Sequence, residues 1–402
     1  MSFRYIGARI SATPPTVTPP SGGEGGSASG AWSLGTVIGY EATSGWPKPL
    51  ILRELWTWGY NAYGQLGLGN TTNYSSPKQV GALTTWSAIA DGGYHTISVK
   101  TDGTLWTWGN NNFGQLGIGN TTNYSSPKQV GSLTTWSKIA AGNSHTVSVK
   151  TDGTIWTWGR NNFGQLGLGN TTNYSSPKQV GALTTWSKIA SGYFHTVSVK
   201  TDGTLWTWGY NAYGQLGLGN TTYYSSPKQV GALTTWLTIA SGLYHTISVK
   251  TDGTLWTWGR NNSGQLGLGN TTNYSSPKQV GSLTTWSKIA GGFYHTIATK
   301  TDGTLWTWGR NNNGQLGIGN TTYYSSPKQV GSLTTWSAIA AGFYHTISVK
   351  TDGTLWTWGQ NTYGQLGLGN TTTYSSPKQV GALTTWLTIA GGGYLTIALK
   401  SS

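Results

Sequence analysis

The chain of 402 residues has no cysteine, a single methionine and few charged residues, which make up only 8% of it. Without cysteine, disulfide frameworks, zinc–thiolate sites and cysteine nucleophiles are excluded. An average domain has about a quarter of its residues charged, so the sequence does not suggest a conventional enzyme with a charged surface. No stretch approaches the roughly 20 apolar residues of a membrane span, and no apolar segment of a secretory signal follows the N-terminus. We therefore expect a soluble protein that is made in a cytoplasm and does not insert into membranes.

Glycine and tryptophan are abundant, with 61 and 23 residues, because a unit of 50 residues recurs seven times between residues 51 and 400. The unit reads TDGTLWTWG-x-N-x-x-GQLG-x-GNTT-x-YSSPKQVG-x-LTTW-x-x-IA-x-G-x-x-HT-x-x-VK. Alternation of Thr, Val and aromatic residues predicts strands at 104–108, 135–140 and 144–150, with a weaker strand at 128–131. Four strands in about 40–50 residues are typical of a β-propeller blade. We interpret the recurring tryptophans, such as Trp106 and Trp108, as packing between blades.

The string W-x-W-G-x-N-x-x-G-Q-L-G, followed by P-x-x-V and I-A-x-G-x-x-H-T, resembles the consensus of the regulator of chromosome condensation repeats. The resemblance covers all seven units and implies an all-β fold, a seven-bladed β-propeller. The family is functionally diverse and includes nucleotide exchange on small GTPases, chromatin binding, ubiquitin ligase regions and a bacterial β-lactamase inhibitor. The resemblance therefore implies a fold without choosing a function.

Hairpin turns of the sequence Thr-Asp-Gly join the units, but the seventh turn is missing. Asp-Gly is the strongest short hairpin signal. It recurs at Asp102, Asp152, Asp202, Asp252, Asp302 and Asp352. The array instead starts at 55–58 and ends at 394–397 without a connecting turn. We expect these two ends to pair as strands and to close the ring, because closure removes exposed strand edges.

A histidine recurs in six units and is replaced by Leu395 in the seventh, where the turn is also missing. We interpret these histidines as structural, with a hydrogen bond to the turn backbone. Neighbouring blades lie about 10 Å apart, which is too far for equivalent positions to share a metal ion at ligand distances of about 2 Å. No metal site is therefore expected at His95, His145, His195, His245, His295 and His345.

Residue patterns for catalysis or cofactor binding are missing. Six of the seven aspartates belong to the hairpin turns, which leaves Asp91 and three glutamates, and no pair has the spacing of a general acid and base. The glycine-rich string GQLGLGN lacks the Lys-Ser/Thr of a phosphate-binding loop. The repeated NTT is interpreted as a turn and not as a glycosylation site. We predict that the protein is not an enzyme and has no cofactor and no metal.

The net charge of +14 comes mainly from lysines that repeat around the array. We interpret them as a solvated surface on a chain that is otherwise short of charge. The alternative is that rings of lysine attract polyanions. We do not expect nucleic acid as a partner; a packaging protein would show a steep salt dependence of binding.

The seven copies differ mainly in two loops, after WTWG and after IA-x-G, where they carry Tyr, Phe, Arg and Asn. These residue types are typical of adaptable interaction surfaces, and loops on a rigid scaffold commonly bind partners. The alternative is drift at tolerant positions. The predicted binding residues are Tyr60, Tyr63, Asn110, Phe113, Arg160, Phe163, Phe194, Tyr210, Tyr213, Tyr244, Arg260, Tyr294, Arg310, Tyr344 and Gln360.

Residues 1–50 do not belong to the array, and their Pro/Thr-rich and Gly/Ser-rich composition predicts a linker. The predicted domains are an extended anchoring leader at 1–50 and a propeller at 51–402. The leader is similar to N-terminal segments of bacteriophage virion proteins in FRYIGARISATPP, in SASGAWSL and in the pair Trp46-Pro47.

This second resemblance implies a virion structural protein that is made in the host cytoplasm and belongs to a larger assembly. The leader would contact other virion proteins, and the propeller would be decorative or would bind a host surface protein or glycan. The alternative is a cellular propeller that binds a protein, as a GTPase regulator or an enzyme inhibitor does. The near equivalence of the blades and the lack of an inserted wedge loop argue against exchange activity.

Overall fold

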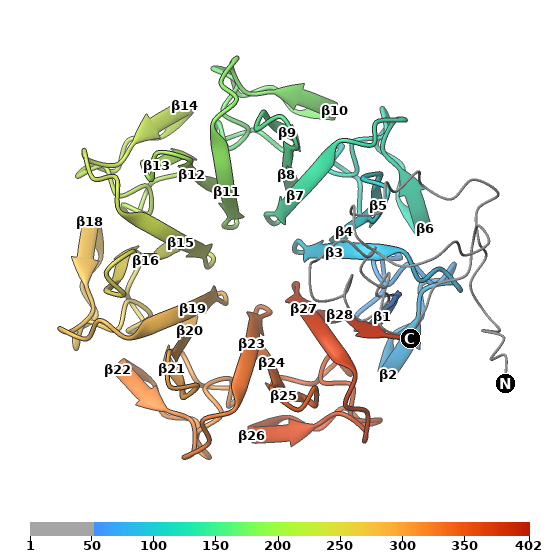
Figure 1. Cartoon of the computed structure of the whole chain (residues 1–402), viewed down its shortest axis with the longest axis vertical. Coiled ribbons are helices and arrows are strands. Elements are labelled where there is room, and N and C mark those ends of the chain that lie inside the picture. Colours follow the sequence, from blue (N-terminus) through green and yellow to red (C-terminus); the bar gives the residue numbers. More distant parts are fainter. Residues whose placement is uncertain (1–51) are drawn as a thin grey trace, which may run out of the picture. The chain divides into compact units, whose positions relative to one another are not determined.

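The computed structural model describes residues 52–402, which form an all-β, seven-bladed propeller (Figure 1). Seven antiparallel sheets of four strands each surround a central channel, so the predicted fold class is confirmed. No helix suited to crossing a membrane is found in the described part of the chain. The predicted domain boundary and the expected contacts of the leader concern residues 1–50, which lie outside the described residues, and both stay predictions.

Each sheet runs outwards from the channel through four strands. The innermost strands are β3 (Trp86–Asp91), β7 (Trp136–Ala141), β11 (Trp186–Ser191), β15 (Trp236–Ser241), β19 (Trp286–Gly291), β23 (Trp336–Ala341) and β27 (Trp386–Gly391). The second strands are β4 (His95–Lys100), β8 (His145–Lys150), β12 (His195–Lys200), β16 (His245–Lys250), β20 (His295–Lys300), β24 (His345–Lys350) and β28 (Leu395–Ser401). The third strands are β1 (Arg53–Gly59), β5 (Leu105–Gly109), β9 (Ile155–Gly159), β13 (Leu205–Gly209), β17 (Leu255–Gly259), β21 (Leu305–Gly309) and β25 (Leu355–Gly359). The outer strands are β2 (Tyr74–Gln79), β6 (Tyr124–Gln129), β10 (Tyr174–Gln179), β14 (Tyr224–Gln229), β18 (Tyr274–Gln279), β22 (Tyr324–Gln329) and β26 (Tyr374–Gln379).

The outer strand is longer and starts earlier than the sequence predicts. A weak strand was expected at 128–131, whereas β6 covers Tyr124–Gln129 and includes Pro127. Its pairing with β5 is irregular between Thr107 and Gly109. Proline cannot donate to a strand ladder and is confined to edge strands or bulges. An outermost strand with an irregular register meets both conditions, so the proline does not end the strand here.

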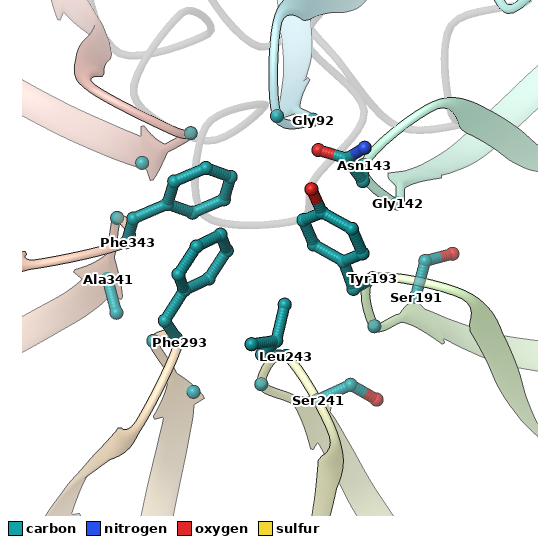
Figure 2. A pocket seen from close by; sticks show the side chains of 18 of the residues that line it. Gly92, Gly142, Asn143, Ser191, Tyr193, Ser241, Leu243, Phe293, Ala341 and Phe343 are labelled. Atoms are coloured by element: carbon teal, nitrogen blue, oxygen red, sulfur yellow. The ribbon is translucent and has the colours of Figure 1, made fainter. Parts of the chain in front are cut away.

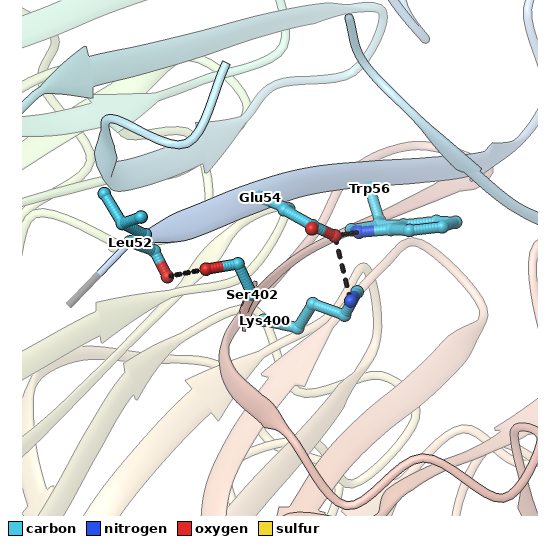
Figure 3. Close-up of polar contacts among 5 residues, drawn as sticks. All are labelled: Leu52, Glu54, Trp56, Lys400 and Ser402. Carbon is cyan, nitrogen blue, oxygen red and sulfur yellow. Dashed lines mark hydrogen bonds and ion pairs between the residues drawn. The ribbon is translucent and has the colours of Figure 1, made fainter. Parts of the chain in front are cut away.

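The closing sheet, which consists of β27, β28, β1 and β2, confirms the predicted closure of the ring. Strand β1 pairs with β28 in an unbroken antiparallel register from Arg53↔Ser401 to Gly59↔Leu395. The Lys400 ammonium lies 2.9 Å from a carboxylate oxygen of Glu54, and the same oxygen accepts a hydrogen bond from the Trp56 indole at 2.9 Å (Figure 3). The two ends of the array are therefore joined by backbone pairing and by a local side-chain network.

The core is divided into seven apolar clusters, each formed where two neighbouring sheets meet. In one of them Leu105 and Val130 from the sheet of β3–β6 contact Trp136 and Trp158 from the next sheet, and all four are buried. Trp108, on the opposite face of β5 from Leu105, packs instead against the closing sheet. This arrangement confirms that the tryptophans serve as packing between blades, because side chains alternate between the two faces of a strand.

Candidate functional site

The six histidines lie at the contacts between neighbouring blades and not at the hairpin turns. In each case the Nε2 atom is 3.0–3.2 Å from a threonine hydroxyl of the next blade, as between His95 and Thr146. The predicted bond to the turn backbone is therefore wrong, because the histidine begins the second strand and the turn follows its far end. Their structural character stands, since all six are fully buried.

The hydrogen-bond pattern also defines the protonation state of these histidines. The Thr146 hydroxyl donates its only proton to the Gln115 carbonyl oxygen at 2.8 Å. The ring of His95 must therefore donate through Nε2, and its buried Nδ1 has no partner. Burial accordingly lowers the pKa of His95 to about 3, because a second proton would be placed in an apolar environment without an acceptor. These residues are neutral and are unsuited to acid–base catalysis near neutral pH.

The repeated lysines are held against aromatic rings. The Lys100 ammonium lies 3.7 Å from the centre of the Trp106 ring, and burial lowers the pKa of Lys100. The lysines of the YSSPKQ strands lie over tyrosines of the same strands, as Lys78 does over Tyr74 at 5.3 Å. Such cation–π contacts give many of these lysines a packing role in addition to charge.

The aspartates of the hairpin turns also have local structural roles. Asp102 accepts hydrogen bonds from the backbone and hydroxyl of Thr104, and these bonds lower its pKa. No group of three or more His, Asp or Glu residues that could hold a metal is found within residues 52–402.

The NTT turns are confirmed as local structure, because the Asn70 side chain accepts the backbone N–H of Thr72 at 3.0 Å.

The central channel is nearly filled at one end by large side chains. A cavity of about 120 Å³ remains between the turns that follow the innermost strands. Tyr193, Leu243, Phe293 and Phe343 point into this space (Figure 2). Neighbouring blades are also tied together here by backbone hydrogen bonds, such as that from Asn143 N–H to the Tyr193 carbonyl at 3.3 Å. The channel is therefore a packed axis and not an open pore at this end.

Asp91 is an exceptional residue of the channel wall, where the other copies have Ala, Ser or Gly. One of its carboxylate oxygens is buried without a hydrogen-bond partner, and the other lies 3.5 Å from the Thr96 hydroxyl. Burial raises the pKa of this carboxyl well above its ordinary value. Burial disfavours the charged form of this carboxyl, because it has little contact with water or with donors.

The two loops in which the copies differ emerge at the same end of each sheet, because consecutive strands are antiparallel. We call this end, with residues 60–63, 73, 92–94 and their equivalents, the variable face. The Thr-Asp-Gly turns lie at the opposite end, here called the turn face. On the variable face Tyr60 contacts Tyr63, Tyr94, Tyr363 and Tyr394, with ring centres 4.7–6.4 Å apart. Two of these contacts, those with Tyr363 and Tyr394, join residues of different repeat units.

Three arginines are inserted between the aromatic rings of the variable face. The guanidinium of Arg260 lies 4.8 Å from the ring centre of Tyr213 in the preceding blade and 5.1 Å from that of Tyr294 in the following blade. Arg160 is placed in the same way between Phe113 and Phe194. Arginine on aromatic faces is less strongly hydrated than lysine and suits interfaces. Within residues 52–402 no exposed carboxylate lies on this face, since Glu54 and the turn aspartates are at the other end.

Most of the predicted binding residues are brought together by the structure. Burial raises the pKa of Tyr244 to about 12, so its hydroxyl remains a hydrogen-bond donor. The predicted residues that belong to the aromatic and arginine contacts are Tyr60, Tyr63, Phe113, Arg160, Phe163, Phe194, Tyr210, Tyr213, Tyr244, Arg260, Tyr294, Arg310 and Tyr344.

Two predicted residues do not join these contacts. Asn110 is only 6% exposed and accepts a hydrogen bond from the Gln115 side chain at 2.7 Å. Gln360 donates to the Thr362 hydroxyl at 3.2 Å. Conversely, Tyr223 was missed, although it contacts Phe163 and Tyr210 across two units. The sequence could have indicated this residue, because the position after NTT also varies between units. Tyr replaces the usual Asn there in only two of them.

Comparison with known families supports the fold and its repeat. A family model described as the RCC1-like domain matches residues 134–398, about two thirds of the chain. The chain belongs to the RCC1-like domain family. Models of the regulator of chromosome condensation (RCC1) repeat match residues 54–99, 102–149 and 86–115 of this RCC1-like propeller. No curated protein sequence matches it.

Solved structures of the same fold come from human and yeast proteins. The crystal structure of human WBSCR16 covers 87% of this chain and 99% of its own, with 22% identity and a TM-score of 0.79. The crystal structure of Prp20p from Saccharomyces cerevisiae covers 88% of this chain and 92% of its own, with 21% identity and a TM-score of 0.79. That work describes binding of Prp20p to Gsp1p and histones. At this identity the likeness concerns the fold of the RCC1-like propeller.

Proposed function

We propose that this RCC1-like propeller is a non-enzymatic module that binds a protein through its variable face. The observation that carries the proposal is the clustering of half-buried tyrosines, phenylalanines and arginines on one face, where the repeat units differ from one another. Aromatic residues and arginine dominate binding energy at protein interfaces. The histidines are neutral and buried, and the described residues hold no cluster of catalytic groups.

The partner surface is proposed to be acidic. Arg160, Arg260 and Arg310 are partly exposed, and no exposed carboxylate of the described residues lies beside them. A partner with carboxylates would therefore gain favourable pairs and meet no like charge. Prp20p is described with two binding partners, Gsp1p and histones. Gsp1p is therefore a suitable probe for this chain, and histones, which are basic, test whether the partner surface must be acidic.

This proposal follows the cellular alternative of the sequence analysis in preference to the virion interpretation. The similar structures come from human and yeast proteins and lend the virion hypothesis no support. Localisation in a virion and anchoring to other virion proteins depend on residues 1–50, outside the described residues. They stay predictions.

The test compares binding of purified Gsp1p and of histones to the full chain and to two variants. The double variant Arg260→Ala, Tyr244→Ala removes one arginine and one aromatic residue of the variable face. Loss of such interface residues is expected to weaken binding by about tenfold or more. Leu133→Ala, on the turn face, is the control and should bind like the parent chain.

Unchanged binding by the double variant would refute the role of the variable face. An equal loss in the Leu133→Ala control would show that the effect is a general one on folding. Failure of the parent chain to bind either probe would remove these two partner classes from the proposal.

A further inference from the structure

Pockets recur between the outer halves of neighbouring blades, towards the turn face. Four of them have volumes of about 410, 430, 430 and 390 Å³. In one, Leu268 and Val280 of the sheet β15–β18 face Trp286, Trp306 and Pro327 of the next sheet. Leu283 lies at the same pocket and is 47% exposed. The pockets are thus mostly apolar and open to solvent, and none of the residues that line them belongs to the variable face.

A lysine ammonium group lines three of the four pockets. Lys300, Lys250 and Lys350 each line one of them. The Lys300 ammonium lies 3.8 Å from the ring centre of Trp306 and 5.3 Å from that of Trp286. No ion pair within 4.0 Å is found for these lysines among residues 52–402, where Lys400–Glu54 is the one recorded pair. These three pockets therefore combine apolar walls with a lysine that makes no ion pair within 4.0 Å, although the turn aspartate two residues further on acts on it at longer range.

An unpaired indole N–H adds a second polar group at the same place. Trp286 is 4% exposed, and its Nε1 atom is buried without a hydrogen-bond partner. The equivalent atom is unpaired in Trp186, Trp236 and Trp336, which line the other three pockets. Buried donors are normally paired, and this one recurs without a partner in every sheet, since Trp86, Trp136 and Trp386 share it.

In the closing sheet a carboxylate of the chain itself contacts the lysine at the equivalent position. There the equivalent lysine, Lys400, is paired with the Glu54 carboxylate, which also accepts the Trp56 indole N–H. In the other six sheets the position of Glu54 is a threonine, which accepts the tryptophan N–H. The lysine there has only the turn aspartate two residues further on, such as Asp252 for Lys250, and makes no ion pair with it within 4.0 Å. In the closing copy a carboxylate therefore contacts the lysine ammonium directly, beside the tryptophan ring (Figure 3).

The residues that line the pockets are nearly the same in each repeat unit, in contrast to the residues of the variable face. The residue types at the positions of Val280, Leu283, Trp286, Lys300 and Trp306 are identical in the four sheet pairs that form the pockets. The position of Leu268 is also leucine, except for Ile318. A ligand that binds one pocket should therefore bind its equivalents, and a molecule carrying several such groups would bind with avidity.

We propose that the inter-blade pockets bind compact apolar groups that carry a carboxylate. The apolar part lies against the leucine, valine and tryptophan side chains, and the carboxylate contacts the lysine ammonium at the rim. Free aromatic acids and the carboxyl terminus of an apolar peptide share this chemistry. The inference concerns a different surface from the proposed function and does not rest on it.

Crystals of the full chain soaked with 4-bromophenylacetate test the proposal site by site. Anomalous bromine density is expected in the pockets, with the carboxylate towards the lysine, and 4-bromophenylacetamide at the same concentration should give at most a tenth of the occupancy. In solution, phenylacetate should show line broadening in the presence of the protein, and phenylacetamide should not. Displacement of the bromine probe by N-acetylleucine but not by phenylacetate would identify the carboxyl terminus of a peptide as the preferred ligand. Displacement by phenylacetate but not by N-acetylleucine would identify a free aromatic acid as the preferred ligand.

Lys300→Met keeps a long apolar side chain over Trp306 and removes the charge. Bromine density should disappear from that pocket alone and remain in the pocket of Lys250. Lys328→Met removes the same charge from a lysine that does not line the pocket, and it should change nothing. Equal binding of the acid and the amide, density unaffected by Lys300→Met, or density in crystals without line broadening in solution would each overturn the proposal.

Discussion

Acidification should unfold the propeller far more steeply than it unfolds an average protein, because six buried histidines are neutral in the folded state. Burial lowers the pKa of each to about 3, whereas the ordinary value of 6.5 applies in the unfolded chain. Between these two values the unfolded chain binds protons that the folded chain does not. Stability is therefore complete above about pH 6.5 and is lost as the pH falls below it.

The size of the effect follows from the number of histidines. Each proton difference contributes about 1.4 kcal/mol per pH unit, so six contribute about 8 kcal/mol per pH unit once the unfolded histidines are charged. Integration from pH 8 to pH 5 gives a loss of about 12 kcal/mol in the free energy of unfolding. Folded domains have about 5–15 kcal/mol in total. We expect cooperative unfolding near pH 5.

Urea unfolding followed by tryptophan fluorescence at pH values from 8 to 5 measures this dependence. The matched variant is His245→Leu, because Leu395 occupies the equivalent position of the closing sheet and is fully buried there. Its pH slope should be about one sixth smaller, since one of six proton differences is removed. A free energy of unfolding that is constant down to pH 5 would refute the reasoning, as would an unchanged slope in the variant.

Two further changes test the packing between blades and the closure of the ring. Gly67 has φ +74°, and a Cβ there would lie 2.7 Å from the Trp108 indole nitrogen, so Gly67→Ala should lower the free energy of unfolding by about 2–4 kcal/mol. Gly81→Ala, at φ +60° with open space around it, should cost only about 1–2 kcal/mol, and equal losses in urea unfolding would contradict the packing argument. Glu54→Ala should cost about 1–2 kcal/mol, because it leaves the Lys400 ammonium and an indole N–H without a partner. An unchanged thermal unfolding midpoint would show that the backbone ladder alone closes the ring.

Much of the fold could be predicted from local patterns. The alternation in Leu105–Gly109, the Asp-Gly turns and the missing seventh turn together give the blades, their number and the closing sheet. The outer strand was placed too late because Pro127 suggests a break, and only its edge position makes the proline acceptable. Local sequence contains no information about which strand lies outermost.

The partners of individual side chains could be predicted much less well. His95 bonds to Thr146, 51 residues further along the chain, so its partner depends on how neighbouring blades meet. The variable loops were recognised as a set, but Asn110 was included although it is buried, and Tyr223 was left out. Both errors arise because exposure depends on the ring geometry, which brings residues of two or three units together.

Because the closing sheet is held together without a covalent turn, the break in the chain could lie in any of the seven blades. Strands β1 and β28 pair in the same way as the strands that a Thr-Asp-Gly turn connects elsewhere, and Arg53 lies opposite Ser401. A short linker between these residues, combined with a cut at another turn, would produce a circular permutant with every sheet retained. The ring could thus be opened at any of its seven blades, and each blade would then serve as the closing one.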